Sequence, residues 1–296
     1  MSKFFEAVKR TENDLGGLEF PLTGPEIPPA APGGSPTVET DAQPQQEPVD
    51  RTRTTGFPTG TFHTAKIRVS AQAPILPFDG SHLNAAEHYR IIRTKIVQHP
   101  AKPRVLCISS TSMGDGKTVS SLNIACSLAL KQGSTALLVD VDLRRPQLAT
   151  LLGLPDRPGL ADVLAGTCTL QEAIVQLAEL PSLYFLPAGF RATNPAELLD
   201  SEAWRNLIAS FRSDFDFTIM DSPPVGVVAD YDLIQAVCDS VILIARPGHT
   251  DRRLLQKGVG RMPEDKFLGL VVNCAEDWFL WHPHPHYYGS YYTRTD

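Results

Sequence analysis

The chain has 296 residues, which is enough for one large domain or two small ones with a buried core. Its formal net charge of −6 and its isoelectric point near 5.8 show no basic excess, so nucleic-acid binding is not expected as its main function. The five cysteines are widely spaced, which argues against a disulfide framework. No apolar run reaches the ~18–20 residues that span a bilayer. Together these features predict a soluble, cytoplasmic protein.

The N-terminal part of the chain is expected to be poorly structured. Within residues 1–18, Phe4, Val8 and Leu15 fall near helical spacing among basic residues, which fits either a short amphipathic helix or a frayed terminus. Residues 19–80 are rich in Pro, Gly, Thr and Gln, and 11 of the 25 prolines lie before residue 81. Because no sustained helical or strand periodicity is present, this segment is predicted to be a flexible, disordered linker.

Residues 81–275 show the alternation of an α/β domain. Helical patterns cover residues 85–93 and 119–130, and a further helix is expected to begin at Pro195 with Asn194 as its N-cap. Continuous apolar runs, typical of strands buried on both faces, cover residues 105–109, 136–140, 183–186, 217–220, 241–245 and 268–272. Such strands separated by helices predict a mostly parallel sheet with helices on both faces.

A glycine-containing loop at residues 111–118 follows the first of these strands and opens a helix. This is the setting of a P-loop, whose glycines let backbone amides point at phosphate while the helix N-terminus adds partial positive charge. Lys117 would reach the β- and γ-phosphates. The residues expected to hold nucleotide are Met113, Gly114, Asp115, Gly116, Lys117, Thr118 and Val119. Thr111 stands where a strict P-loop has its first glycine, and the alternative is a chance Gly-Lys-Thr at a strand–helix turn.

Two other predicted strands end in aspartates. Asp140 and Asp142 follow the run at 136–140, and Asp221 follows the run at 217–220. Ligands of open α/β sheets bind beyond the carboxyl ends of the strands, so these carboxylates are expected to converge near the phosphate loop, where Mg²⁺ chemistry needs oxygen ligands. Taken singly, each aspartate could equally be a helix cap or a loop residue.

The last segment, residues 276–296, is a tyrosine-rich tail. It contains four of the seven tyrosines of the chain, Tyr287, Tyr288, Tyr291 and Tyr292, whereas generic disordered tails are poor in aromatic residues. These phenols are predicted to be phosphate acceptors; the alternative is a sticky tail without function. The alternating His282, His284 and His286 leave a metal site open, and Trp278 and Trp281 are expected to pack against the domain or a partner.

From about Asn84 to the C-terminus, these motifs resemble the bacterial tyrosine kinase (BY-kinase) family. Residues 110–118 resemble its Walker A motif, in which the first glycine is replaceable. Asp140, Asp142 and Arg144 match its Asp-x-Asp-x-Arg motif, Asp221 and Pro224 match its Walker B motif, and Glu87, Arg90 and Arg93 match its helical Glu-x-x-Arg-x-x-Arg motif. Partitioning ATPases share the fold but carry an extra lysine early in the loop, where this chain has Ser112.

The resemblance implies a P-loop NTPase fold and a protein-tyrosine autokinase that uses ATP and Mg²⁺. The catalytic residues that it implies are Lys117, Asp140, Asp142, Asp221 and Arg144, and the metal ligands are Thr118, Asp140 and Asp221. Asp142 would be the base or a second metal contact. Arg144 would neutralise the transferred phosphate or tie the Asp142 loop to the sheet. Asn273 would lie near adenine or would only end a strand.

The resemblance also implies partners. Glu87, Arg90 and Arg93 would contact the next subunit of a ring-like homo-oligomer, although such spacing also suits a solvated helix face. A membrane activator of the polysaccharide co-polymerase type would recruit the protein to the inner face of the membrane, and a phosphotyrosine phosphatase would reverse the modification. Phosphorylation in trans would regulate exopolysaccharide synthesis or export. The rivals are a partitioning- or positioning-type ATPase and a non-catalytic nucleotide-binding regulator.

Overall fold

The computed structural model describes residues 62–68, 83–190 and 192–275. These residues all fall within the unit Thr55–Asp296, and the unit Met1–Thr54 lies outside the described residues. The predicted helix at 1–18 and the tail at 276–296 also lie outside them. In the described ranges, no helix combines the length and the apolar character that a membrane span requires.

Strands and helices alternate along the described chain. The strands are β1 (His63–Ala65), β2 (Val105–Ser110), β3 (Ala136–Asp140), β4 (Val175–Leu177), β5 (Leu180–Leu186), β6 (Phe217–Asp221), β7 (Ser240–Ala245) and β8 (Phe267–Val272). The helices are α2 (Leu83–Val97), α3 (Lys117–Ala129), α4 (Leu148–Leu151), α5 (Leu160–Leu164), α6 (Leu170–Ala173), α7 (Pro195–Leu199), α8 (Glu202–Asp214), α9 (Asp230–Val237) and α10 (Arg252–Gly260).

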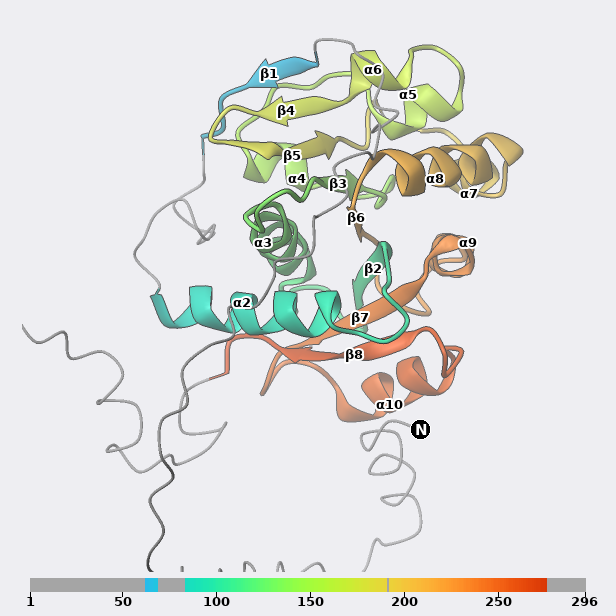
Figure 1. Ribbon diagram of the computed structural model, residues 1–296. Helices are drawn as coiled ribbons and strands as arrows, with labels where there is room; N and C mark the ends of the chain where they lie inside the picture. The colour runs from blue at the N-terminus through green and yellow to red at the C-terminus, as the bar shows by residue number, and fades with distance from the viewer. Residues whose placement is uncertain (1–61, 69–82, 191, 276–296) are drawn as a thin grey trace, which may run out of the picture. The chain divides into compact units, whose positions relative to one another are not determined.

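The strands form one sheet in the order β1-β4-β5-β3-β6-β2-β7-β8. Every described pairing is parallel except that of β4 with β5, so β1 and β4 run against the other strands. Helices α2 and α3 lie on one face of the sheet, and α8 and α9 lie on the other (Figure 1). The predicted mostly parallel sheet with helices on both faces is therefore confirmed.

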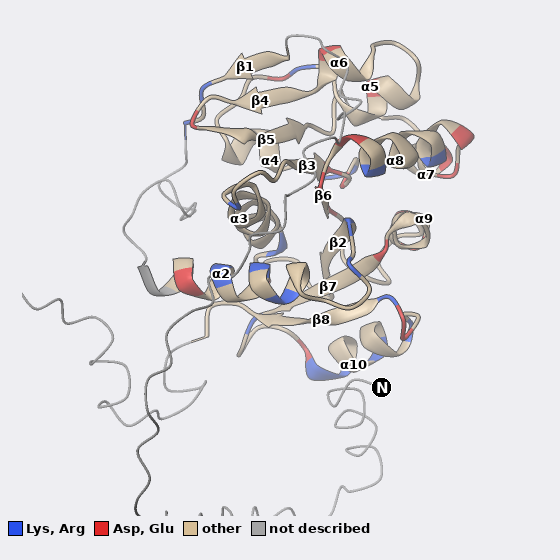
Figure 2. Ribbon diagram, in the orientation of Figure 1, with Lys and Arg blue, Asp and Glu red and all other residues tan. Residues whose placement is uncertain are grey.

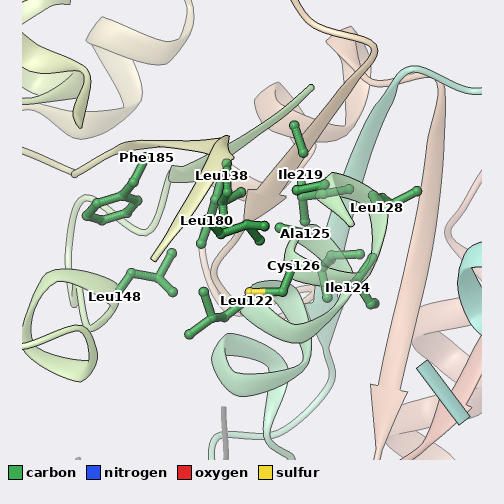
Figure 3. Close-up of a cluster of buried hydrophobic side chains, with 14 of the residues drawn as sticks. Leu122, Ile124, Ala125, Cys126, Leu128, Leu138, Leu148, Leu180, Phe185 and Ile219 are labelled. Carbon is green, nitrogen blue, oxygen red and sulfur yellow. The ribbon is translucent and has the colours of Figure 1, made fainter. Parts of the chain in front are cut away.

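The core lies between α3 and the sheet. Leu122, Ile124 and Leu128 of α3 are buried against Leu138 of β3 and Ile219 of β6 (Figure 3). Full burial of one such side chain is worth ~1.5–3 kcal/mol. The strands β2, β3 and β7 are buried along their whole length, which explains why their sequences are continuous apolar runs rather than alternating ones. This packing fixes the carboxyl ends of β2, β3 and β6 beside the start of α3.

One part of the predicted linker at 19–80 is wrong, because a strand lies within it. His63–Ala65 forms β1, which pairs in parallel with β4 at the end of the sheet, with His63 opposite Val175. Beyond the strand, the Arg68 amide donates to the Leu152 carbonyl at 2.9 Å. Three residues are too few to show a periodicity, and main-chain bonds to a distant partner, rather than a local pattern, hold this segment.

Two other predictions need adjustment at their edges. The helix predicted at 119–130 begins two residues earlier, at Lys117, and the strand predicted at 183–186 begins at Leu180. Helix α7 does begin at Pro195 with Asn194 at the N-cap position, but the Asn194 side chain makes no capping bond. Its amide donates to the Glu197 carboxylate at 2.9 Å instead.

Candidate active site

The loop between β2 and α3 has the backbone that a phosphate loop needs. Gly114 and Gly116 have φ angles of 85° and 90°, in the left-handed region that favours glycine. A Cβ atom on Gly116 would also collide with the amide of Asn273. Helix α3 begins at Lys117 without a side-chain cap at Gly116, so its first amide groups remain available to an anion.

Asp115 holds this loop in shape from inside. Its buried carboxylate accepts the Ser112 amide at 3.1 Å and the Thr250 hydroxyl at 2.6 Å. Its main-chain carbonyl accepts the Asn273 side-chain amide at 2.9 Å. Asp115 was predicted among the nucleotide-binding residues. The structure places its side chain within the loop, where it ties the loop to the segments that follow β7 and β8.

Lys117 lies at the centre of a cluster of acidic and hydroxyl side chains. Its Nζ atom is 3.3 Å from Asp142 Oδ2, 3.6 Å from Asp221 Oδ2 and 3.4 Å from Thr118 Oγ1. Asp221 accepts the Thr118 hydroxyl at 2.8 Å and the Ser121 hydroxyl at 3.0 Å. Asp142, Asp221 and Thr118, predicted to converge on Lys117, are therefore brought together by β3, β6 and α3.

Asp140 lies beside Asp221, because the two residues are paired in register on β3 and β6. Its Oδ2 atom accepts the amides of Gln147 and Leu148, both at 3.1 Å, and so caps the start of α4. Its Oδ1 atom is buried and has no hydrogen-bond partner among the described residues. The cap therefore uses one oxygen of the carboxyl group, and the other oxygen is the one on which the predicted metal role would fall.

The charges of this cluster are not balanced. Burial, and next the neighbouring Asp221 carboxylate, raise the pKa of Asp140 to about 8. Burial also raises the pKa of Asp221, although Lys117 opposes this effect. Burial lowers the pKa of Lys117, but Asp221, Asp142 and Asp140 outweigh it, so the pKa lies above its ordinary value. Asp140 and Asp221 thus have raised pKa values, and Asp140 Oδ1 has no described partner. A hard cation bound here would stabilise the ionised carboxylates.

Arg144 bonds to the first residue of α9. Its guanidinium makes two hydrogen bonds, of 2.8 and 2.9 Å, to the buried carboxylate of Asp230. The next residue, Arg145, donates its amide to Asp142 Oδ1 at 3.1 Å, and its side chain reaches Met113 Sδ at 3.2 Å. Of the two roles predicted for Arg144, this geometry fits the tying of the Asp142 loop, with α9 as the anchor rather than the sheet.

The predicted subunit-contact residues on α2 do not share one environment. Glu87 and Arg90 form an ion pair of 2.6 Å on the surface, with side chains 46% and 57% exposed. Arg93 instead donates to the Ser127 carbonyl of α3 at 3.0 Å, so it packs α2 against α3. Glu87 and Arg90 remain available for a neighbouring subunit.

Of the other predicted site residues, some lie within the described ranges and some do not. Met113 is 65% exposed at the tip of the loop, and Val119 is half-buried in the first turn of α3. The predicted acceptors and the alternating histidines lie outside the described residues; they are Tyr287, Tyr288, Tyr291, Tyr292, His282, His284 and His286.

Sequence reasoning missed several residues of the site. Ser121 is one, because a serine inside a helix gives no signal until the helix is placed beside Asp221. His249 is another: its Nε2 atom lies 2.8 Å from the Met113 carbonyl oxygen. His249 and Thr250 follow the carboxyl end of β7, so the rule that directed attention to Asp140 and Asp221 would also have found them.

Comparisons with known proteins find related chains. Residues 103–253 match a family described as an AAA domain. The tyrosine-protein kinase CpsD of Streptococcus pneumoniae serotype 4 is 32% identical over 192 residues, which cover 64% of this chain and 84% of that protein. The tyrosine-protein kinase YwqD of Bacillus subtilis strain 168 is 32% identical over 192 residues, which cover 64% of this chain and 80% of that protein.

Solved structures also match this chain. The VpsO kinase domain matches with a TM-score of 0.59 and 33% identity, over 65% of this chain and 95% of that chain. The chimerical protein CapA2B2 matches with a TM-score of 0.62 and 28% identity, over 71% of this chain and 92% of that chain.

Proposed function

The chain belongs to the family of bacterial tyrosine kinases, and from that premise we propose that it is an ATP-dependent autokinase whose acceptors are the tyrosines of its own C-terminal tail. The main support is the position of Lys117, whose ammonium lies between Asp142 and Asp221 at the start of α3. Here a triphosphate would meet the loop amides, the lysine and two carboxylates together.

The residues fit a nucleotide with Mg²⁺. Amides of Gly114 to Thr118 and the Lys117 ammonium would hold the β- and γ-phosphates, and Asn273 would lie near the base. Thr118, Asp140 and Asp221 are the proposed metal ligands, since they supply hard oxygens and Asp140 Oδ1 has no described partner. In the described ranges, no three His, Cys, Asp or Glu side chains are placed to hold a metal ion by themselves. The two aspartates and Thr118 would therefore share the ion with phosphate oxygens of the nucleotide. Bound Mg²⁺ would offset charge on the phosphates.

Asp142 is the proposed general base. Its side chain is 8% exposed, against 1% for Asp221, so it is the more accessible of the two carboxylates beside Lys117. The phenol oxygen would form a bond to the γ-phosphorus while the bond from that phosphorus to the bridging oxygen of ADP breaks. The phenol proton would pass to Asp142, and Lys117 would stabilise the charge on the phosphates. The alternative for Asp142 is a second contact to the metal.

The proposed acceptors are Tyr287, Tyr288, Tyr291 and Tyr292. Each phosphotyrosine adds about −1.5 to −2 charge, so four would add roughly −6 to −8. This would about double the formal net charge of −6. An unmodified tail would then bind at a neighbour's active site, and its phosphorylation would expel it from this acidic cluster. Ring assembly through Glu87 and Arg90 would thereby become reversible.

The biological setting is proposed from the family. A membrane activator of the polysaccharide co-polymerase type would bring the kinase to the inner face of the membrane. A phosphotyrosine phosphatase would return the tail to its acceptor state. The cycle would regulate the synthesis or export of an exopolysaccharide.

A phosphotyrosine assay tests the proposal. Purified protein is incubated with Mg-ATP, with and without a membrane activator, beside Lys117→Met and a variant with all four tail tyrosines changed to Phe. We expect phosphotyrosine in the unchanged protein, none in Lys117→Met and most of it lost in the Phe variant. The Phe variant should still bind nucleotide, since it leaves the phosphate loop, Lys117, Asp142 and Asp221 unchanged.

The rivals give different results in the same assay. Phosphate release without phosphotyrosine would support a partitioning- or positioning-type ATPase. Nucleotide binding with neither activity, even with the activator present, would support a non-catalytic regulator. Undiminished phosphotyrosine in the Phe variant would reject the tail as the acceptor but keep the kinase.

A further inference from the structure

A mostly apolar groove of about 480 Å³ lies between α2 and the strand β8, and its lining includes no residue of the Lys117 cluster. Ile91, Ile92 and Ile96 of α2 form one wall, and residues 268–272 of β8 form the other. Ile91 is 46% exposed and Val272 is 38% exposed, which is unusual for large apolar side chains that lie together. The groove is within the ~300–1,000 Å³ range of pockets that bind drug-sized ligands.

The strand side of the groove is open in two ways. β8 is the last strand of the described sheet and pairs only with β7 among the described strands. Gly269, which is opposite Ile242 of β7, also leaves space, because a Cβ atom added there would meet nothing within 4 Å. A strand edge that no other described strand covers, beside an apolar groove, is a template for an extended apolar segment.

The chain itself supplies such a segment directly after this strand. β8 ends at Val272, and Cys274 has a φ of 54°, a left-handed conformation that is typical of a turn. Residues 276–281 then read Glu-Asp-Trp-Phe-Leu-Trp. The six residues from Val272 to Trp278 can extend up to ~20 Å, whereas residues 268–272 span only ~13 Å of strand. The segment is therefore long enough to return over the whole groove.

We infer that residues 278–281 of the same chain dock in the groove between α2 and β8. Two tryptophans, a phenylalanine and a leucine would cover Ile91, Ile92 and Val272. Charge supports this occupant, since α2 carries several basic turns (Figure 2) and the segment begins with Glu276 and Asp277. This inference does not depend on the proposed kinase activity.

One further apolar segment outside the described residues, within residues 1–18, fits less well. At residues 1–18, Phe4 and Phe5 are flanked by Lys3, Lys9 and Arg10, which would face the basic turns of α2. It also lies more than 60 residues before α2 along the chain, so its local concentration at the groove would be lower.

Acrylamide quenching of tryptophan fluorescence in the full chain tests the docking. The chain has three tryptophans, and Trp204 is fully buried, so the quencher-accessible emission reports Trp278 and Trp281. Two variants close the groove in different ways: Gly269→Leu fills it, and Ile91→Asp places a charge in it. Leu130→Asp is the matched control, because Leu130 is 48% exposed at the end of α3 and does not line the groove. Circular dichroism checks that each variant is folded.

We expect shielded, blue-shifted tail tryptophans in the unchanged protein and in Leu130→Asp, at all protein concentrations. Gly269→Leu and Ile91→Asp should raise the quenching constant by at least about twofold, because the indoles then become exposed to solvent. Full accessibility in the unchanged protein would overturn the inference. So would shielding that is lost on dilution, which would assign the groove to a second copy, or shielding that survives both groove variants.

Discussion

The two oxygens of Asp140 lie in different environments when no ligand is bound: one accepts backbone amides, and the other is buried without a described partner. Its Oδ2 atom caps α4 through the amides of Gln147 and Leu148, while its Oδ1 atom is buried beside the Asp221 carboxylate without a described partner. Ionising this group without a cation is unfavourable, as the raised pKa of about 8 reflects. Active sites often carry such destabilising groups because binding needs them.

The substitution Asp140→Asn is therefore expected to stabilise the nucleotide-free protein. The folded state keeps the Asp140 proton up to a pKa of about 8, whereas the unfolded state loses it near the ordinary value. The free energy of unfolding of the unchanged protein thus falls as pH rises through this window, and the variant avoids this loss. Urea unfolding without Mg²⁺ should show a gain of about 1–3 kcal/mol at pH 8 and less at pH 5.

Adding Mg-ADP provides the control for this prediction. The unchanged protein should gain stability from the ligand, and Asp140→Asn should gain much less, because it lacks the ionised oxygen proposed to serve the metal. A variant that is less stable than the unchanged protein at pH 8 would show that Asp140 is a cap and nothing more.

Arg144 makes a separate prediction at the residue scale. Its two bonds to the buried Asp230 carboxylate suggest that it acts by positioning the loop that carries Asp142. Arg144→Ala leaves Asp230 without these bonds and should cost about 1–3 kcal/mol of stability. Arg144→Ala and Asp230→Asn should lower phosphotyrosine formation by similar factors, because each substitution releases the loop that carries Asp142. If only Arg144→Ala affects the phosphorylation rate, Arg144 contacts phosphate directly.

At the scale of elements, Thr111 and α10 fit together closely. A Cβ atom on Gly258 would lie 2.7 Å from Thr111 Cγ2, so the threonine in place of the usual loop glycine occupies the space that a glycine on α10 leaves. Gly258→Ala should therefore destabilise the protein by about 1–3 kcal/mol, as overpacking of a buried site does. Thermal unfolding measures the effect, and Thr111→Gly in the same chain should restore most of the loss.

The same helix offers a matched control. A Cβ atom on Gly260 would meet nothing within 4 Å, so Gly260→Ala should be neutral or stabilising by up to ~1 kcal/mol, since alanine favours helix. Equal effects of the two alanines would mean that contact with Thr111 is not the cause.

The elements also show which features a sequence makes predictable. The buried strands β2, β3, β6 and β7 were found because burial on both faces makes them continuous apolar runs. Asp140 and Asp221 were found because they end such strands. In contrast, β1 and β4 have three residues each, and their pairing comes from distant partners. Ser121 and the Arg144–Asp230 pair were not predicted, since only packing brings α9 to the Asp142 loop.

At the scale of the whole molecule, reach does not decide which subunit phosphorylates which tail. When residues 278–281 leave the groove, the 14 residues from Asn273 to Tyr287 can extend up to ~45 Å, so a tail can then reach either its own site or that of a neighbour. The exposed Glu87–Arg90 pair on α2 gives a way to separate assembly from catalysis. An exposed pair of this kind contributes less than about 1 kcal/mol to stability, so its removal should leave the fold intact.

A mixing experiment tests transfer in trans. Lys117→Met with an intact tail is combined with an active chain of different size whose four tail tyrosines are Phe. We expect phosphotyrosine on the Lys117→Met chain, because the partner's active site is the only competent one present. The rate per molecule should rise with protein concentration, as a reaction between subunits requires.

Glu87→Gln with Arg90→Gln in both chains should then lower this transfer severalfold while nucleotide binding stays unchanged, since the pair lies on α2 and not on the phosphate loop. Lys117→Met alone gives the background. The reaction would be assigned to a single chain by two results together. The Lys117→Met chain would carry no phosphotyrosine, and the phosphorylation rate per molecule of the unchanged protein would not depend on its concentration. In that case the α2 pair would be an ordinary solvated surface pair, as its spacing alone would suggest.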